Sequence, residues 1–166
     1  LTPPDFSIIR LDRQALSRGG LAIIYKDDIG IKPFFTTHYS SFEYLGVELT
    51  TKGTKPTKLH TIFHPPGDNQ LFTEDLSNLI TNNALTDSND ILLGDLNLHW
   101  NDPDNKPVQD LTTILDLHDL HQICKGPTQI KGVTLDAIIA KSDLATLKSI
   151  TPSDWSDHHL ITFNLN

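Results

Sequence analysis

Three short segments of this 166-residue chain carry the residue types of a hydrolytic site. Gly94-Asp95-Leu96-Asn97 comes first, Thr134-Leu135-Asp136 follows, and Ser156-Asp157-His158-His159 lies near the end of the chain. Together they supply three carboxylates, one amide and an imidazole. Such a set can hold a divalent metal ion, transfer a proton and hydrolyse a phosphodiester.

Asp95 directly follows the apolar residues 91–93 and a glycine, so we expect it at the exit of a buried strand. Ligand sites favour the carboxyl ends of strands, and the glycine allows a bend or a close backbone approach. Asn97 would face the same side in an extended segment. An Asx turn that caps the strand explains the pair equally well. An EF-hand loop is excluded, because Trp100 and Lys106 stand at its sixth and twelfth positions.

Asp136 lies within the apolar residues 133–139, where a carboxylate is costly unless it is paired. His158 follows Asp157, and an imidazole beside a carboxylate is a candidate for proton transfer or phosphate binding. Such a histidine needs an acceptor that orients its ring, and we expect Asp136 to be that acceptor. The alternative is a structural Asp136 that bonds to backbone amides.

Other polar and aromatic residues have simpler structural explanations. His118 and His121 lie near an expected helix end, where a cation is favoured. Trp100 and Trp155 are expected in the core rather than against a nucleobase. The lysines of residues 51–58 are expected to be solvated loop residues.

A net charge of −8 at neutral pH argues against broad electrostatic attraction to nucleic acid. It does not exclude nucleic acid as the substrate, because a metal-dependent nuclease must itself gather carboxylates. Cys124 is the only cysteine, so no intrachain disulfide can form and an intracellular setting is expected. No apolar run reaches membrane-spanning length, so we expect no membrane partner.

The apolar patterns predict one mixed α/β domain over residues 1–166. Amphipathic helices are expected at residues 70–82 and around residues 108–115, the second opened by Pro107. Strands outnumber helices, which predicts stacked sheets with helices outside. The expected strands are residues 7–11, 21–25, 31–35, 44–49, 59–63, 90–93, 135–139 and 160–165.

The three segments occur in the order used by the endonuclease/exonuclease/phosphatase superfamily. More narrowly, the chain resembles the apurinic-type endonuclease domain of LINE-type (non-LTR) retrotransposon polyproteins, over nearly its whole length. The resemblance implies a two-sheet β-sandwich flanked by helices on both outer faces. Further matching segments are Leu1-Thr2-Pro3, Ser41-Phe42-Glu43-Tyr44, His64-Pro65-Pro66-Gly67, Gly126-Pro127-Thr128 and residues 156–166.

The resemblance implies hydrolysis of a phosphodiester in double-stranded DNA with Mg²⁺ (or Mn²⁺) as the cofactor. His158 would contact the scissile phosphate or transfer a proton, and Asp136 would orient His158. Asp95 and Asn97 would position the attacking water or the leaving oxygen, and Asp157 would bind the metal. The nick would leave a 3′-hydroxyl that primes reverse transcription by the rest of the polyprotein, in the nucleus.

Substrate contacts are implied for Phe63, His64 and Lys131, the last in a DNA-contacting loop at residues 126–132. Phe63 stands where the family usually has Tyr, and Phe cannot donate a hydrogen bond to a phosphate oxygen. His64 could substitute in part, although adjacent strand residues point to opposite faces.

The family usually places an Asn and a metal-binding Glu on the first strands, just before the Leu-Thr-Pro segment. This chain begins at that segment and contains no Met, so we expect a fragment truncated at its N-terminus and lacking both residues. A retrotransposon endonuclease domain is therefore the first hypothesis. A catalytically inactive remnant or co-opted binding module is the second, and a small-molecule phosphoesterase of the same superfamily is the third.

Overall fold

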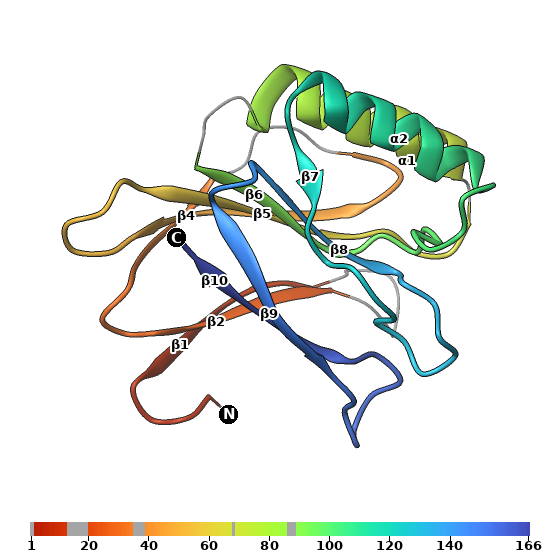
Figure 1. Cartoon of the computed structure of the whole chain (residues 1–166). Coiled ribbons are helices and arrows are strands. Elements are labelled where there is room, and N and C mark those ends of the chain that lie inside the picture. Colours follow the sequence, from red (N-terminus) through yellow and green to blue (C-terminus); the bar gives the residue numbers. More distant parts are fainter. Residues whose placement is uncertain (1, 13–19, 35–38, 68, 86–88) are drawn as a thin grey trace.

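The computed structural model describes residues 2–12, 20–34, 39–67, 69–85 and 89–166 (Figure 1). Leu1 of the Leu1-Thr2-Pro3 segment and Phe35, the expected end of a strand, lie outside the described residues. In the described part of the chain, no helix is both long enough and apolar enough to cross a membrane.

A six-stranded sheet forms the centre of the domain. β5 and β6 run parallel, because α1 (Asn69–Leu79) carries the chain back between them, and every other neighbouring pair is antiparallel. The strands follow one another across the sheet as β3 (Gly30–Phe34), β4 (Glu43–Thr50), β5 (Thr57–Phe63), β6 (Asp90–Asp95), β8 (Asp136–Ala140) and β7 (His121–Gln122).

Two helices cover one face of this sheet (Figure 1). α1 continues into a short π-helical turn, η1 (Ile80–Ala84), while α2 (Lys106–Leu117) begins at Asn105, whose side chain accepts a hydrogen bond from the Val108 amide. Both helices have the apolar periodicity expected from the sequence. Their buried side chains meet the sheet in one core cluster, which includes Phe72, Leu76, Leu79, Leu111, Leu115, Ile62 and Leu92.

Two hairpins lie on the opposite face of the sheet (Figure 1). β1 (Phe6–Leu11) pairs with β2 (Leu21–Lys26), and β9 (Ala145–Thr151) pairs with β10 (Leu160–Leu165). A second core cluster fills this side of the sheet, with Ile91, Ile138 and Ala140 from the sheet and Ala145 from β9.

The predicted mixed α/β sandwich is confirmed. Within the described ranges both α-helices lie on the same side of the six-stranded sheet, so the second helical layer implied by the resemblance has no counterpart there. The sequence patterns also missed β9, because its alternation of small and polar residues is weak.

Candidate active site

The ends of two neighbouring strands bring two carboxylates together. Asp95 is the last residue of β6, Asp136 is the first residue of β8, and the two are paired directly across the antiparallel strands. Directly opposed residues of an antiparallel pair project from the same face of the sheet. Asp95 therefore lies at the exit of a strand, as the sequence predicted, and the pairing of β6 with β8 places Asp136 next to it.

The backbone at position 94 requires a glycine. Its φ is +146°, and a Cβ atom at this position would lie 1.8 Å from the carbonyl oxygen of Ile62 on β5. No side chain fits in that space, so only glycine lets β5 and β6 approach closely and still direct the next residue into the site.

Asn97 ties the end of β6 to the adjacent loop. Its φ is +47°, its amide N–H donates to Asp95 Oδ1 at 3.0 Å, and its Nδ2 donates to the carbonyl of His64 at 2.7 Å. The Asx turn allowed by the sequence is therefore present. It orients the Asp95 carboxylate, and a direct catalytic role for the Asn97 side chain stays a prediction.

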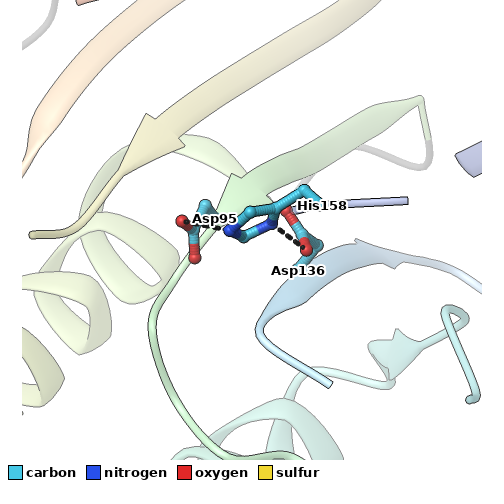
Figure 2. Close-up of side chains that lie close together, drawn as sticks. All are labelled: Asp95, Asp136 and His158. Carbon is cyan, nitrogen blue, oxygen red and sulfur yellow. Dashed lines mark hydrogen bonds and ion pairs between the residues drawn. The ribbon is translucent and has the colours of Figure 1, made fainter. Parts of the chain in front are cut away.

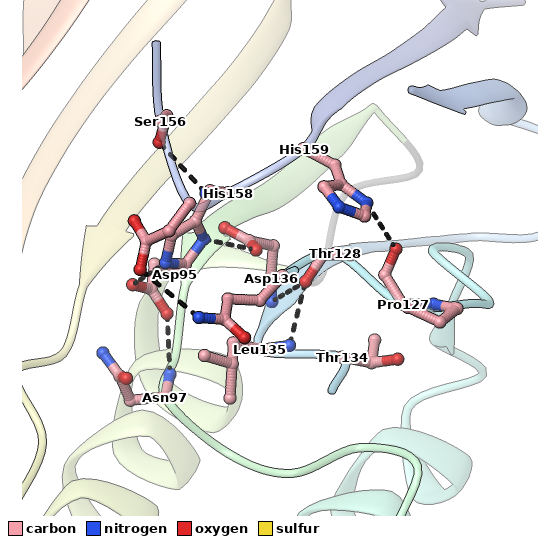
Figure 3. Close-up of polar contacts among 12 residues, drawn as sticks. Asp95, Asn97, Pro127, Thr128, Thr134, Leu135, Asp136, Ser156, His158 and His159 are labelled. Carbon is pink, nitrogen blue, oxygen red and sulfur yellow. Dashed lines mark hydrogen bonds and ion pairs between the residues drawn. The ribbon is translucent and has the colours of Figure 1, made fainter. Parts of the chain in front are cut away.

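His158 reaches the strand ends from the loop between β9 and β10. This loop pairs with the segment around Gln129: the Ile130 amide donates to the Asp157 carbonyl at 3.0 Å, and the His159 amide donates to the Thr128 carbonyl at 2.7 Å. These backbone bonds hold the histidine over the start of β8 (Figure 3).

The three residues form a compact cluster. His158 Nδ1 lies 2.9 Å from Asp136 Oδ2, and His158 Nε2 lies 3.7 Å from Asp95 Oδ2 (Figure 2). An imidazole with one nitrogen on a carboxylate and the other toward a second acid is suited to proton transfer. The expected partnership of Asp136 and His158 is thus present in the geometry.

Two side chains that the sequence analysis did not single out position Asp136. The buried Thr128 Oγ1 accepts hydrogen bonds from the amides of Leu135 at 2.9 Å and Asp136 at 3.1 Å. Gln122 Nε2 donates to the Asp136 carbonyl at 3.2 Å. Only the match of Gly126-Pro127-Thr128 to the family hinted at Thr128, and nothing local marks Gln122.

Charges within the cluster set its proton affinities. Burial by itself lowers the pKa of His158, but the hydrogen bond and charge of Asp136, together with the charges of Asp95 and Asp157, outweigh it, and the pKa is raised overall. Burial raises the pKa of Asp95 and the nearby charge of Asp136 adds to this, against the opposing hydrogen bond from Asn97. Both groups therefore favour their protonated forms more than isolated side chains do.

The cluster offers a place for a divalent cation. One ligand atom from each of Asp95, Asp136 and His158 lies within 4.8 Å of the others. Carboxylate oxygens suit Mg²⁺ and Mn²⁺, and the imidazole nitrogen suits softer transition metals. The donor set therefore fits a divalent metal ion, in keeping with the general metal dependence of the superfamily.

Asp157 lies beside this cluster but is not one of its three members. Its Oδ2 accepts a hydrogen bond from Gln129 Nε2 at 3.3 Å, and the residue is exposed. The metal-binding role implied for Asp157 therefore stays a prediction.

The positions of the three implied substrate-binding residues differ. Phe63 ends β5 beside Asp95, and Lys131 lies in an exposed turn. His64 is only 2% exposed and stacks on Phe72 with ring centroids 3.9 Å apart. Its two ring nitrogens contact the Ser41 carbonyl and Asn69 Oδ1. This placement does not support contact between His64 and a phosphate.

The two tryptophans have different environments. Trp100 is partly buried and packs against the core, as expected. Trp155 was expected in the core, and that expectation is wrong, since the residue is 84% exposed. The sequence signal that distinguishes Trp155 is that its neighbours are polar, whereas core residues recur in an apolar periodic pattern.

The chain belongs to the Endonuclease/Exonuclease/phosphatase family, because residues 6–158 match the sequence profile of that family. Members of this superfamily are nucleases and phosphatases. The match confirms the superfamily and does not separate the retrotransposon endonucleases from its other branches. A comparison with curated proteins finds no match.

Solved structures share the fold at low sequence identity. A functionally unknown conserved protein from Enterococcus faecalis V583 is similar with a TM-score of 0.58 and 15% identity, over 97% of this chain and 77% of that one. D. rerio TDP2 complexed with a single-stranded DNA product is similar with a TM-score of 0.53 and 15% identity, over 96% and 77% of the two chains. At these identities the similarity concerns the fold alone.

Proposed function

We propose that this chain is a metal-dependent DNA endonuclease domain of a LINE-type retrotransposon polyprotein. It would nick double-stranded DNA in the nucleus and leave a 3′-hydroxyl that primes reverse transcription. The observation that carries the proposal is the position of His158, which lies between the carboxylates of Asp136 and Asp95 at the end of the central sheet. The family match supports hydrolysis of a phosphate ester, and the resemblance of the flanking segments points to DNA as the substrate.

In this proposal Asp136, Asp95 and His158 have different roles in proton transfer. Asp136 accepts a hydrogen bond from His158 Nδ1, which leaves Nε2 directed toward Asp95 and the reacting phosphate. Asp95 lies beside His158 Nε2, so its carboxylate is positioned to accept the proton of an attacking water. An imidazolium at His158, favoured by its raised pKa, donates a hydrogen bond to a phosphate oxygen and offsets its negative charge.

Hydrolysis then forms a bond between the water oxygen and phosphorus and breaks the bond between phosphorus and the 3′ oxygen. The His158 imidazolium donates a proton to the leaving oxygen, so the products are a 3′-hydroxyl and a 5′-phosphate. The carboxylates of Asp95 and Asp136 would hold Mg²⁺ (or Mn²⁺), which supplies charge stabilisation for the phosphate oxygens.

Nicking of supercoiled plasmid, with Mg²⁺ and with EDTA, tests the proposal. We expect Mg²⁺-dependent nicking that is lost in Asp95→Asn and His158→Ala, and kept in the control His121→Ala, which removes an exposed histidine outside the cluster. Extension of the nick by an added reverse transcriptase on an RNA template would reveal the 3′-hydroxyl.

The other two hypotheses give different results in the same assay. Hydrolysis of small phosphate esters without nicking of DNA would favour a small-molecule phosphoesterase. A folded protein with neither activity would favour an inactive remnant or a co-opted binding module.

A further inference from the structure

The loop that carries His158 also carries a large exposed aromatic ring. Trp155 lies in a turn between β9 and β10, where its amide donates to Ser153 Oγ at 3.4 Å. Its exposed fraction of 84% is the highest among the large apolar side chains of the described residues. His158 follows three positions later in the chain, so the Cα atoms of the two residues lie at most about 11 Å apart.

A second exposed apolar side chain lies on the segment that pairs with this loop. Ile130 is 63% exposed and precedes Lys131. The Ile130 amide donates to the Asp157 carbonyl at 3.0 Å, so the two segments are held side by side, as they also lie in Figure 1. The two exposed apolar side chains therefore lie on the same two segments that position His158 and Asp136.

The charges around Trp155 indicate what kind of contact it can make. Asp154 and Asp157 flank the position, and the whole chain carries a net charge of −8. Phosphates are therefore disfavoured beside Trp155 itself, and electrostatic attraction cannot supply much affinity for a polyanion. An uncharged, flat partner avoids that repulsion, and stacking of a nucleobase on an aromatic ring contributes about 1–3 kcal/mol.

We propose that Trp155 is a stacking platform for an unpaired nucleobase next to the phosphate held at His158, with Ile130 as an apolar contact beside it. This inference rests on the proposed nuclease function and names its substrate more closely. In a regular duplex each base is stacked within the helix, so its face cannot meet the indole. The preferred substrate is therefore DNA that is unpaired or distorted at the cleavage site.

Binding measured in EDTA tests stacking without cleavage. In a Trp100→Phe background Trp155 is the remaining tryptophan, so its fluorescence reports on the stacked base directly. We expect quenching by a single-stranded 12-mer, at least tenfold weaker binding of the same oligonucleotide with abasic residues, and weaker binding of its blunt duplex.

The fluorescence anisotropy of a labelled 12-mer measures DNA binding by variants. It distinguishes stacking on Trp155 from a nonspecific effect of removing any exposed apolar side chain. Trp155→Ala should weaken binding at least tenfold, whereas Trp155→Phe should stay within about threefold because it keeps a ring. Leu117→Ala is the matched control, since Leu117 is 79% exposed on α2, and it should bind like the parent. Equal binding by Trp155→Ala and Leu117→Ala would overturn the inference.

Two further results separate this inference from the proposed function. Plasmid nicking and 12-mer binding that are both unaffected by Trp155→Ala would overturn the inference and leave the nuclease intact. Stacking without Mg²⁺-dependent cleavage would support the inference and contradict the nuclease function. A dimer of the parent protein that Trp155→Ala dissociates in sedimentation, with no quenching by DNA, would overturn the inference in favour of a second copy of the chain.

Discussion

The pKa of histidine is shifted in opposite directions in two regions of the molecule: the helix-covered face of the central sheet and the ends of its strands. On the helix-covered face, His60 of β5 is 1% exposed and its Nδ1 lies 2.8 Å from the Tyr44 hydroxyl. Burial, with a smaller effect of the Lys58 charge, lowers the pKa of His60 to about 4. At the strand ends, the acidic neighbours of His158 outweigh its burial and raise its pKa.

The difference shows that burial decides the charge of a histidine only where no acid faces it. The covered face contains polar rings that are enclosed by aromatic neighbours, as His64 is by Phe72. The strand ends instead gather Asp95, Asp136 and His158, all three of which are partly exposed. We therefore expect stability to depend mainly on the first region and catalysis on the second, and substitutions should separate the two.

The largest effect is expected for His158→Ala. Removing the imidazole eliminates proton transfer and one positive charge next to the phosphate, which should lower kcat for nicking by about 10³-fold. The thermal midpoint should change little, since His158 lies at the rim and not in the core. Steady-state nicking and a melting curve on the same preparation check both parts. A variant that keeps one tenth of the parent rate would contradict the assignment.

A large effect on folding is expected for Gly94→Ala, which tests the junction between the two regions. The new methyl group would meet the Ile62 carbonyl oxygen at 1.8 Å, and the backbone would have to shift. We expect a loss of about 4 kcal/mol in the free energy of unfolding, measured with urea. Gly53→Ala is the control, since Gly53 also has a positive φ but nothing within 4 Å, and it should cost about 1 kcal/mol.

The location of the site could be predicted from the sequence to a useful extent. The apolar run before Asp95 marked a strand exit, and the isolated carboxylate of Asp136 required a partner. Both arguments depend on local pattern and on the cost of burying a charge. The structure brings these residues together with His158 as those arguments require.

Other features depend on tertiary packing and could not be predicted. His64 has the residue type of a phosphate ligand, but its stacking on Phe72 follows from how α1 lies on the sheet. Trp155 has the residue type of a core side chain, but no element covers it. The hydroxyl of Thr128 reaches two amides seven and eight residues away, and no short-range pattern encodes that contact.

The pH dependence of stability should carry the signature of His60. Its pKa is about 4 in the folded protein and 6.5 as the ordinary value, so between these values the unfolded chain binds a proton that the folded chain does not. The free energy of unfolding should therefore fall as pH falls from 6.5 to 4, by about 3 kcal/mol from this group. Urea unfolding at several pH values should give a shallower dependence in His60→Gln. Parallel curves for the two proteins would contradict the expectation.

The smallest effect tests how the loop before β8 holds Asp136 in place. Thr128 is fully buried, and its hydroxyl oxygen accepts hydrogen bonds from the backbone amides of Leu135 and Asp136. Thr128→Val keeps the shape but leaves both amides without that acceptor, which should cost about 2 kcal/mol in the free energy of unfolding. Because the Asp136 amide is no longer held, the hydrogen bond to His158 should loosen and kcat should fall as well. Thr128→Ser keeps the hydroxyl and should restore kcat. If Thr128→Val nicked DNA at the parent rate while it was destabilised, the contact would serve the fold alone, and Asp136 would be held in place by its strand pairing.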